Sequence, residues 1–467
     1  MKALFKPRSI AVIGASNNPS RIGGMPIRFL QKHGYPGKIY PVNPKYQEVF
    51  GLPCYPALTS IPGEVDLVLV AIQKRFIFET LQECSEKRVP YVILFTAGYG
   101  ETGKEGKKEQ EELLRFARRT GIRLIGPNCI GIVCPHEHLT ASFISGLEMP
   151  SLMPGNIAVI AQSGGVCNAI LTRTSERLMG LRGLISTGNE LDLEMADFIE
   201  HFVQDPQTHV ITLLIESLKN PAGFLRAADR AIQGNKPIVV LKVGRSEKGM
   251  EATASHTGAM AGSYAVYQGL FRQKGISSVS DIDELFEVAH LLGRYGPRGG
   301  NRLAILSISG GTGALMADLA ADNRLLLPSP SPRTHDHLHD LIPETTSMAN
   351  PMDITTQFMN DADAIARYLQ TFAEDEKFDV LVLVLTLTAS EQTLALAHHL
   401  ALIAPSLEKP LVICWPVGMI AHQTFRLIEE AGIPLFFHPA RCMSALGHFA
   451  HYGKFRKARE LHHESHE

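Results

Sequence analysis

Short apolar runs rich in β-branched residues alternate with amphipathic helical patterns along nearly the whole chain, and this alternation constrains the fold more than any other feature. Strands of a parallel sheet are buried on both faces, so they read as continuous apolar runs. The pattern therefore predicts an α/β fold whose sheets are mostly parallel. With 467 residues, and at roughly 150 residues per domain, the chain has room for about three such domains.

The expected strands fall into three series. The first contains RSIAVIGAS, GKIYPVN, VDLVLVAI, YVILFTAG and RLIGPN; the second contains NIAVIAQ, LRGLISTG, HVITLLIES and KPIVVLKVG; the third contains RLAILSISGG, DVLVLVLTL, PLVICWP and IPLFF. The segment Tyr295–Asn301 carries a proline and three glycines and indicates the clearest boundary. We predict domains over residues 1–145, 150–295 and 300–460.

Charge and hydropathy narrow the function classes. A formal net charge of −2 disfavours nucleic acids and anionic membranes as partners. No apolar run approaches the roughly 20 residues that span a bilayer, and the amino terminus MKALFKPRSIAVIGAS does not end in a signal-peptide cleavage site, so we expect a cytoplasmic protein. Seven cysteines without a CxxC pair indicate neither a disulfide framework nor a zinc ribbon, and we expect no metal site.

A glycine turn follows the first expected strand at Gly14, Ala15 and Ser16. Backbone N–H groups in such a turn can bind a phosphate, although the spacing G-x-G-x-x-G of a nicotinamide site is missing. The second strand ends at Lys45 instead of at an acidic residue that would hold ribose hydroxyls, and a lysine suits a phosphate. The alternative is a turn that serves packing only.

Two further turns lead from a buried strand into a helix, at Ser163-Gly164-Gly165 and at Gly310-Gly311-Thr312. The positive ends of two helices could meet at one phosphate. Neither turn is a P-loop, since the chain contains no Walker A sequence. Tight packing of strand against helix explains each turn equally well when it is taken alone.

One histidine, His256, lies in a stretch of small residues and glycines between residues 254 and 262, which we expect to be a loop. Neutral imidazole is a nucleophile at physiological pH, and phosphoryl transfer to it needs a carboxylate that orients the second ring nitrogen. Glu216 is a candidate, because it ends a buried strand where parallel sheets place their ligand sites. A plain surface histidine is the alternative.

Four motifs in a fixed order make the chain similar to a known family. They are Gly126-Pro127-Asn128-Cys129, Gln162-Ser163-Gly164-Gly165, Ser186-Thr187-Gly188-Asn189-Glu190 and Ser255-His256-Thr257-Gly258. With them, the chain resembles the α subunits of the ADP-forming (NDP-forming) acyl-CoA synthetases, relatives of succinyl-CoA synthetase. The resemblance implies a Rossmann-like CoA-binding domain followed by two flavodoxin-like domains.

The resemblance also implies roles for particular residues. His256 would be the residue that is phosphorylated, with Glu216 as its carboxylate partner. The two cradles of the phosphoryl group would be Ser163, Gly164 and Gly165 in one turn and Gly310, Gly311 and Thr312 in the other. The CoA site would include Gly14, Ala15, Ser16, Lys45 and Asn128.

The family reaction converts a small carboxylic acid, CoA and ATP into acyl-CoA, ADP and phosphate, reversibly, through an acyl phosphate and a phosphohistidine. The family's ATP-grasp region does not occur in this sequence. The resemblance therefore implies a partner β subunit that holds ATP or ADP with Mg, in a heterotetramer of the α2β2 type.

Two other functions remain open from the sequence. A catalytically reduced, regulatory protein that binds CoA or acyl-CoA would keep the fold, but His256 and Glu216 are both retained here. A nicotinamide-dependent oxidoreductase is disfavoured by Lys45 at the end of the second strand. The sequence does not name the acid.

Overall fold

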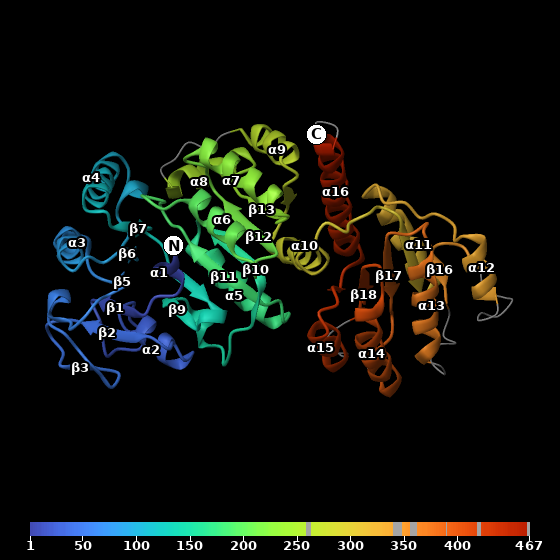
Figure 1. The fold of residues 1–467 in the computed structure, drawn as a ribbon, viewed down its shortest axis with the longest axis horizontal. Helices are drawn as coiled ribbons and strands as arrows, with labels where there is room; N and C mark the ends of the chain where they lie inside the picture. Colours follow the sequence, from blue (N-terminus) through green and yellow to red (C-terminus); the bar gives the residue numbers. More distant parts are fainter. Residues whose placement is uncertain (258–262, 340–347, 355–361, 389, 418–421, 465–467) are drawn as a thin grey trace. The chain divides into compact units, whose positions relative to one another are not determined.

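The structure is a computed structural model that describes residues 1–257, 263–339, 348–354, 362–388, 390–417 and 422–464. It divides into two compact units, one of residues 1–274 and 278–282 and the other of residues 275–277 and 283–467. Each unit is described by itself (Figure 1). None of the helices among the described residues is long and apolar enough to cross a bilayer.

The first sheet has the order β2-β1-β5-β6-β7, and each of its neighbouring strands pairs in parallel. In chain order its strands are β1 (Ser9–Ile13), β2 (Lys38–Val42), β5 (Leu67–Val70), β6 (Tyr91–Leu94) and β7 (Arg123–Ile125). The core of this sheet is apolar on both faces, since every residue of β1 and of β5 is buried. The continuous apolar runs of the sequence therefore have the expected cause.

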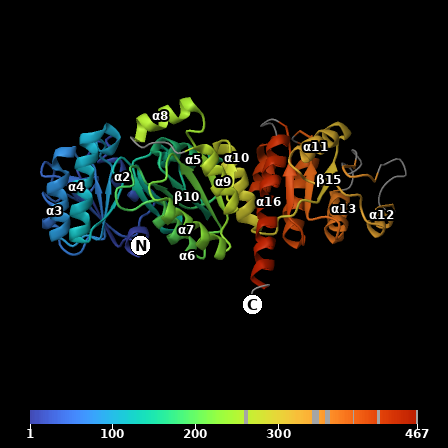
Figure 2. The same cartoon turned by 90° about the horizontal axis from the view of Figure 1, so that it is seen from above.

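Helices cover both faces of the first sheet. The helices are α1 (Lys2–Phe5), α2 (Met25–Lys32), α3 (Ile77–Glu86) and α4 (Lys104–Thr120), and a short ladder joins β3 (Glu48–Val49) to β4 (Leu52–Pro53). In Figure 2, α3 and α4 lie on one side and α2 on the other, as right-handed crossovers in opposite directions require. Helix α4 ends at Gly121, whose φ of 80° is the left-handed geometry that glycine adopts at low cost.

The second sheet is mixed, with the order β14-β13-β12-β10-β11-β8-β9. Its strands are β8 (Gly131–Cys134), β9 (Leu139–Ser142), β10 (Pro154–Ala161), β11 (Leu181–Ser186), β12 (Val210–Ile215), β13 (Ile238–Lys242) and β14 (Ser277–Val279). Strands β10 to β13 pair in parallel, whereas β8 is antiparallel to β11 and to β9. The helices are α5 (Gly164–Glu176), α6 (Met195–Gln204), α7 (Pro221–Gln233), α8 (Glu247–Thr257) and α9 (Tyr264–Gln273).

The third sheet has the order β16-β15-β17-β18-β19, which is the doubly wound order of flavodoxin-like domains. Its parallel strands are β15 (Leu303–Ser307), β16 (Met352–Asp353), β17 (Val380–Val384), β18 (Leu411–Cys414) and β19 (Leu435–Phe436). The helices are α10 (Ile282–Tyr295), α11 (Gly310–Asp322), α12 (Pro332–His339), α13 (Ala362–Glu374), α14 (Glu391–Ile403), α15 (His422–Glu430) and α16 (Pro439–Glu464). The predicted α/β class is confirmed.

The borders between sheets differ from those that the sequence indicates. Strands β8 and β9 fall inside the range 1–145 but belong to the second sheet. The division into compact units falls ahead of α10 instead of in Tyr295–Asn301, and α10 contacts α16 through the Ser444 hydroxyl, which donates to Glu284 at 2.6 Å. The three domain ranges stay a prediction.

Candidate functional site

The site lies where the second sheet reverses its strand order. The chain leaves β10 for β11 on one side and later places β12 on the other, so the ends of β10 and β12 form a switch point of the kind where α/β proteins bind ligands. Ala161 pairs with Leu214, and the next residues, Gln162 and Glu216, follow at the carboxyl ends of the two strands.

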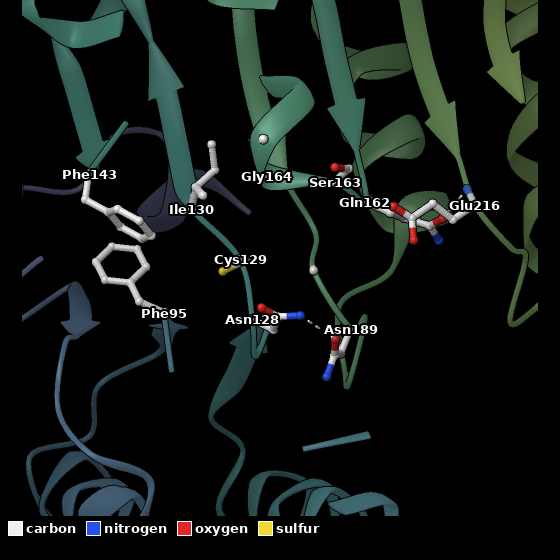
Figure 3. A pocket seen from close by; sticks show the side chains of 12 residues that line it. Phe95, Asn128, Cys129, Ile130, Phe143, Gln162, Ser163, Gly164, Asn189 and Glu216 are labelled. Atoms are coloured by element: carbon white, nitrogen blue, oxygen red, sulfur yellow. Dashed lines mark hydrogen bonds between the residues drawn. The ribbon is translucent and has the colours of Figure 1, made fainter. Parts of the chain in front are cut away.

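A cavity of 230 Å³ opens at this switch point. Its lining includes Glu216 and the turn Ser163-Gly164-Gly165. Figure 3 shows Glu216, Gln162 and Ser163 on one side of the cavity and Phe95 and Phe143 on the other. The structure thus brings together two of the groups that the sequence singles out separately, a carboxylate and a glycine-rich helix start.

Gln162 fixes the end of strand β12. Its Oε1 atom accepts hydrogen bonds from the backbone N–H groups of Glu216 at 2.6 Å and of Ser217 at 3.1 Å. Its Nε2 atom donates to the Ser217 carbonyl at 2.7 Å and to the Glu190 carboxylate at 2.9 Å. The amide group therefore makes four hydrogen bonds, and the backbone at Glu216 is held in one position.

Glu190 is a buried carboxylate behind Gln162. It also accepts a hydrogen bond from the Thr187 hydroxyl at 2.9 Å. Burial raises the pKa of Glu190 to about 7, against the hydrogen bonds from Gln162 and Thr187 that favour the ionised form. A carboxyl group that titrates near neutrality thus lies two hydrogen bonds away from the backbone of Glu216.

Lys242 lies on the other side of Glu216, at the end of β13. Its ammonium group donates to the Glu216 carbonyl oxygen at 2.9 Å and to the Val243 carbonyl oxygen, and lies 4.8 Å from the centre of the Tyr267 ring. Burial lowers the pKa of Lys242. The side chain of Glu216 is itself buried, with 7% of its surface exposed.

Helix α5 presents its amino terminus to the cavity. Ser163 is the N-cap residue, and within the described part of the chain its side chain makes no capping hydrogen bond. The first N–H groups of α5 thus keep their capacity to bind an anion.

At the second turn, by contrast, the N-cap Ser309 of α11 accepts a hydrogen bond from the Thr312 N–H at 3.4 Å. A Cβ on Gly310 would lie 3.0 Å from a carboxylate oxygen of Asp353, so this turn too has an acidic neighbour. The two turns belong to different compact units.

The Gly-Pro-Asn-Cys turn contributes Asn128 and Cys129 to the same cavity. Asn128 has a φ of 58°, its N–H donates to the Thr96 carbonyl at 3.0 Å, and its side-chain amide donates to Asn189 at 3.4 Å. Asn128, which we predict to contact CoA, lines the cavity with Glu216, whereas the other residues of the predicted CoA site do not: Gly14, Ala15, Ser16 and Lys45.

The Gly14 turn follows β1 as predicted, and a Cβ on Gly14, where φ is 84°, would lie 2.4 Å from the Ala71 carbonyl oxygen. However, the N–H groups of Gly14 and Ala15 both donate to the Val42 carbonyl, at 3.0 and 3.2 Å. These two N–H groups therefore already have a partner within the fold, and the role of the turn in binding CoA stays a prediction.

Two other groups at the Gly14 turn are placed by the fold. The Ser16 hydroxyl accepts from the Asn18 N–H at 3.1 Å. Lys45 is exposed, and its backbone N–H donates to Asn43 at 3.0 Å.

The backbone of His256 lies in the last turn of α8, which extends to Thr257. The expectation of a loop from residue 254 onwards is therefore wrong for the first four of these residues. The side chain of His256 lies outside the described residues, as do residues 258–262.

The sequence assigns no separate role to Gln162, Phe95 and Phe143, which line the cavity, or to Glu190, which is buried behind Gln162. Gln162 and Glu190 belong to the family motifs, whereas Phe95 and Phe143 do not. The signal for Phe95 was its place directly after the apolar run YVIL, at the carboxyl end of a parallel strand. Nothing local marks Glu190 as buried.

Two family models match the chain. A CoA binding domain matches residues 8–135, and a succinyl-CoA ligase like flavodoxin domain matches residues 154–292. Together they cover the first sheet, most of the second sheet and every residue that lines the cavity except Phe143.

Known proteins match the chain over most of its length. It is 36% identical over 439 residues to the ADP-forming acetate–CoA ligase II subunit alpha of Pyrococcus furiosus, covering 93% of this chain and 94% of that subunit. It is 32% identical over 380 residues to a trans-feruloyl-CoA synthase of an unknown prokaryotic organism, covering 81% of this chain and 54% of that protein.

A solved structure is also similar. The dinucleotide forming acetyl-coenzyme A synthetase 1 of Candidatus Korarchaeum cryptofilum, in complex with phosphate and ADP, matches with a TM-score of 0.89 and 30% identity, covering 98% of this chain and 97% of that one. With these relatives, the two domain models and the switch-point cavity, the chain belongs to the α subunits of the ADP-forming acyl-CoA synthetases.

Proposed function

We propose that this chain catalyses the acyl and phosphoryl transfer steps of an ADP-forming acid–CoA ligase, with His256 as the phosphoryl carrier. The observation that carries the proposal is the cavity that Glu216 and the open amino terminus of α5 line together. A phosphoryl group needs donors for its oxygens, which α5 supplies, and a histidine carrier needs a carboxylate, which Glu216 supplies.

The reaction proceeds through three transfers. A nitrogen of the His256 ring attacks the γ-phosphorus of ATP, and ADP leaves. A carboxylate oxygen of the acid then attacks the phosphorus, which releases the neutral ring and forms an acyl phosphate. The CoA thiol, losing its proton, attacks the acyl carbon and expels phosphate, which gives acyl-CoA. The reverse sequence makes ATP from acyl-CoA, phosphate and ADP.

Glu216 orients the ring of His256 and stabilises the imidazolium form that arises in these transfers. The hydrogen bond from the Glu216 backbone N–H to Gln162 supports this role, because a catalytic carboxylate must be held in one geometry. In the same proposal, Gly310, Gly311 and Thr312 form the second cradle of the phosphoryl group, and Ser163, Gly164 and Gly165 form the first.

CoA binds at the turn of Gly14, Ala15 and Ser16, with Lys45 at a phosphate. The exposed position of Lys45 after β2 supports this placement, as does the match of residues 8–135 to a CoA binding domain. Asn128, which lines the cavity, contacts the thiol end of CoA in this proposal.

A partner subunit with an ATP-grasp fold holds ATP or ADP with Mg, in an α2β2 heterotetramer. The Pyrococcus furiosus relative is a subunit alpha, which supports a multi-subunit enzyme. The absence of a Walker A sequence from this chain agrees with a nucleotide site elsewhere.

The test is phosphorylation of the chain from acyl-CoA and radioactive phosphate, with the partner subunit present. We expect a label that is lost in acid and kept in base, as a phosphohistidine requires, and its absence in His256→Ala. His209→Ala is the matched control, because His209 lies ahead of β12 at the opposite end from Glu216. Full labelling of His256→Ala would refute the proposal.

A further inference from the structure

We propose that the ring pair of Phe95 and Phe143 forms the wall of the acyl subsite and favours small aliphatic carboxylic acids over aromatic ones. The inference rests on the proposed function, because it places the acyl group of the acyl phosphate in the cavity beside α5 (Figure 3).

The cavity has two chemically different ends. Glu216, Gln162 and Ser163 make one end polar, while Phe95, Phe143 and Ile130 make the other apolar. An acyl phosphate of an aliphatic acid has the same division, with a charged phosphate joined to an apolar chain. A phosphate held at the start of α5 would therefore direct its acyl chain toward the two rings.

The two ends are in contact. A Cβ on Gly164, at the start of α5, would lie 2.6 Å from the Cγ2 atom of Ile130, so only a glycine allows α5 to approach so closely. A Cβ on Gly131 would lie 3.1 Å from the Phe95 ring. The apolar end thus begins immediately beside the helix terminus, and a short acyl group reaches the rings.

The rings are held in place from two different sheets. Phe95 follows β6 of the first sheet and Phe143 follows β9 of the second. Their centroids are 4.9 Å apart and their planes meet at 75°, an edge-to-face packing that stabilises both rings. Phe95 is 7% exposed and Phe143 is half-buried, and both rings line the cavity on that side.

The size and polarity of the cavity select the acid. Its 230 Å³ lies below the range of about 300–1,000 Å³ of drug-sized ligand sites, and the phosphate takes part of it. An aromatic acyl group needs more of the remaining volume than an acetyl group does. A second carboxylate, as in a dicarboxylic acid, would be desolvated against two phenyl rings without a cationic partner among the lining residues.

The experiment uses the chain with its partner subunit and measures kcat/KM for acetate, isobutyrate and phenylacetate in ATP-dependent acyl-CoA formation. We expect the wild type to prefer acetate over phenylacetate. Phe143→Ala and Phe95→Ala should each raise the ratio of phenylacetate to acetate by at least about tenfold, because removing a wall ring opens the pocket. Phe143→Leu, which keeps most of the volume and folding stability, should give a smaller rise.

Phe78→Ala is the matched control. Phe78 makes a similar edge-to-face pair with Phe116, at 5.1 Å and 61°, but it is 44% exposed and does not line the cavity. The Phe78→Ala variant should have the same ratio of phenylacetate to acetate kcat/KM as the wild type.

An unchanged acid preference in active Phe95 and Phe143 variants overturns the inference. So does a rise in the KM of CoA at a constant acid ratio, which would assign the rings to the pantetheine arm of CoA. Wild-type protein that forms no acyl-CoA from any acid would refute the proposed function itself, and that result is distinct from the other two.

Discussion

The side-chain amide of Gln162 holds the backbone N–H of Glu216 at 2.6 Å, across two neighbouring strands of the second sheet. The same amide group donates to Glu190 at 2.9 Å. The candidate catalytic carboxylate is thus tied to a second, buried carboxylate through one glutamine. The effects of substituting the two carboxylates can be told apart by experiment, because Glu216 lines the cavity and Glu190 does not.

Glu216→Gln should slow phosphorylation of the chain by at least about a hundredfold while leaving the fold intact. An amide keeps the size of the side chain but stabilises an imidazolium poorly. The rate of labelling from acyl-CoA and phosphate measures the effect, and circular dichroism checks the fold. Glu79→Gln, at an exposed position on α3, is the control. Labelling of the Glu216 variant at the wild-type rate would remove Glu216 from the mechanism.

Glu190→Gln should remove a pH dependence of stability. In the folded protein the pKa of Glu190 is raised to about 7 from 4.5, so the native state keeps a proton that the unfolded chain has already lost. The free energy of unfolding therefore falls as the pH rises from 4.5 to 7, and the total loss at pH 7 is roughly 3 kcal/mol.

The measurement for Glu190 is the difference in urea midpoint between wild type and variant, at pH 5 and at pH 8. Glu190 accepts hydrogen bonds from Gln162 and Thr187, and a glutamine can accept only one of them. The variant should therefore have a lower urea midpoint than the wild type at pH 5. At pH 8 the urea midpoint of the variant should be higher relative to that of the wild type than it is at pH 5. Equal pH dependence in both proteins would mean that Glu190 does not titrate in this range.

Lys45→Ala should weaken the binding of CoA by roughly tenfold. It should weaken the binding of dephospho-CoA less, because that ligand lacks the ribose phosphate that the ammonium group contacts in the proposal. Calorimetric titration with both ligands measures this. Lys38→Ala serves as the control, since Lys38 begins the strand, β2, that ends just before Lys45. Equal losses for the two ligands would place the lysine away from the ribose phosphate.

The chain without its partner should not form ATP from ADP, acyl-CoA and phosphate at an appreciable rate. It contains no Walker A sequence, and the proposed nucleotide site belongs to the partner. A luciferase assay on the purified chain, before and after addition of the partner, measures the difference. Efficient ATP formation by the chain alone would reveal a nucleotide site within it.

The fold class and part of the site could be predicted because they depend on local patterns. Continuous apolar runs such as LVLV of β5 indicate buried parallel strands wherever they occur. A turn of small residues after such a strand, as at Ser163 and Gly164, predicts a helix amino terminus at the ligand edge of the sheet. Glu216 could be placed at the same edge for the same reason.

The rest was decided by the tertiary structure, because it depends on which strands become neighbours. The order β12-β10-β11 places Gln162 between Glu190 and Glu216. Glu190 is buried in this arrangement, and its burial raises its pKa to about 7. Phe95 and Phe143 meet because the ends of β6 and β9, from two different sheets, lie together. The continuous apolar runs of the sequence determine which residues are buried, whereas sheet order determines which of them meet in the cavity.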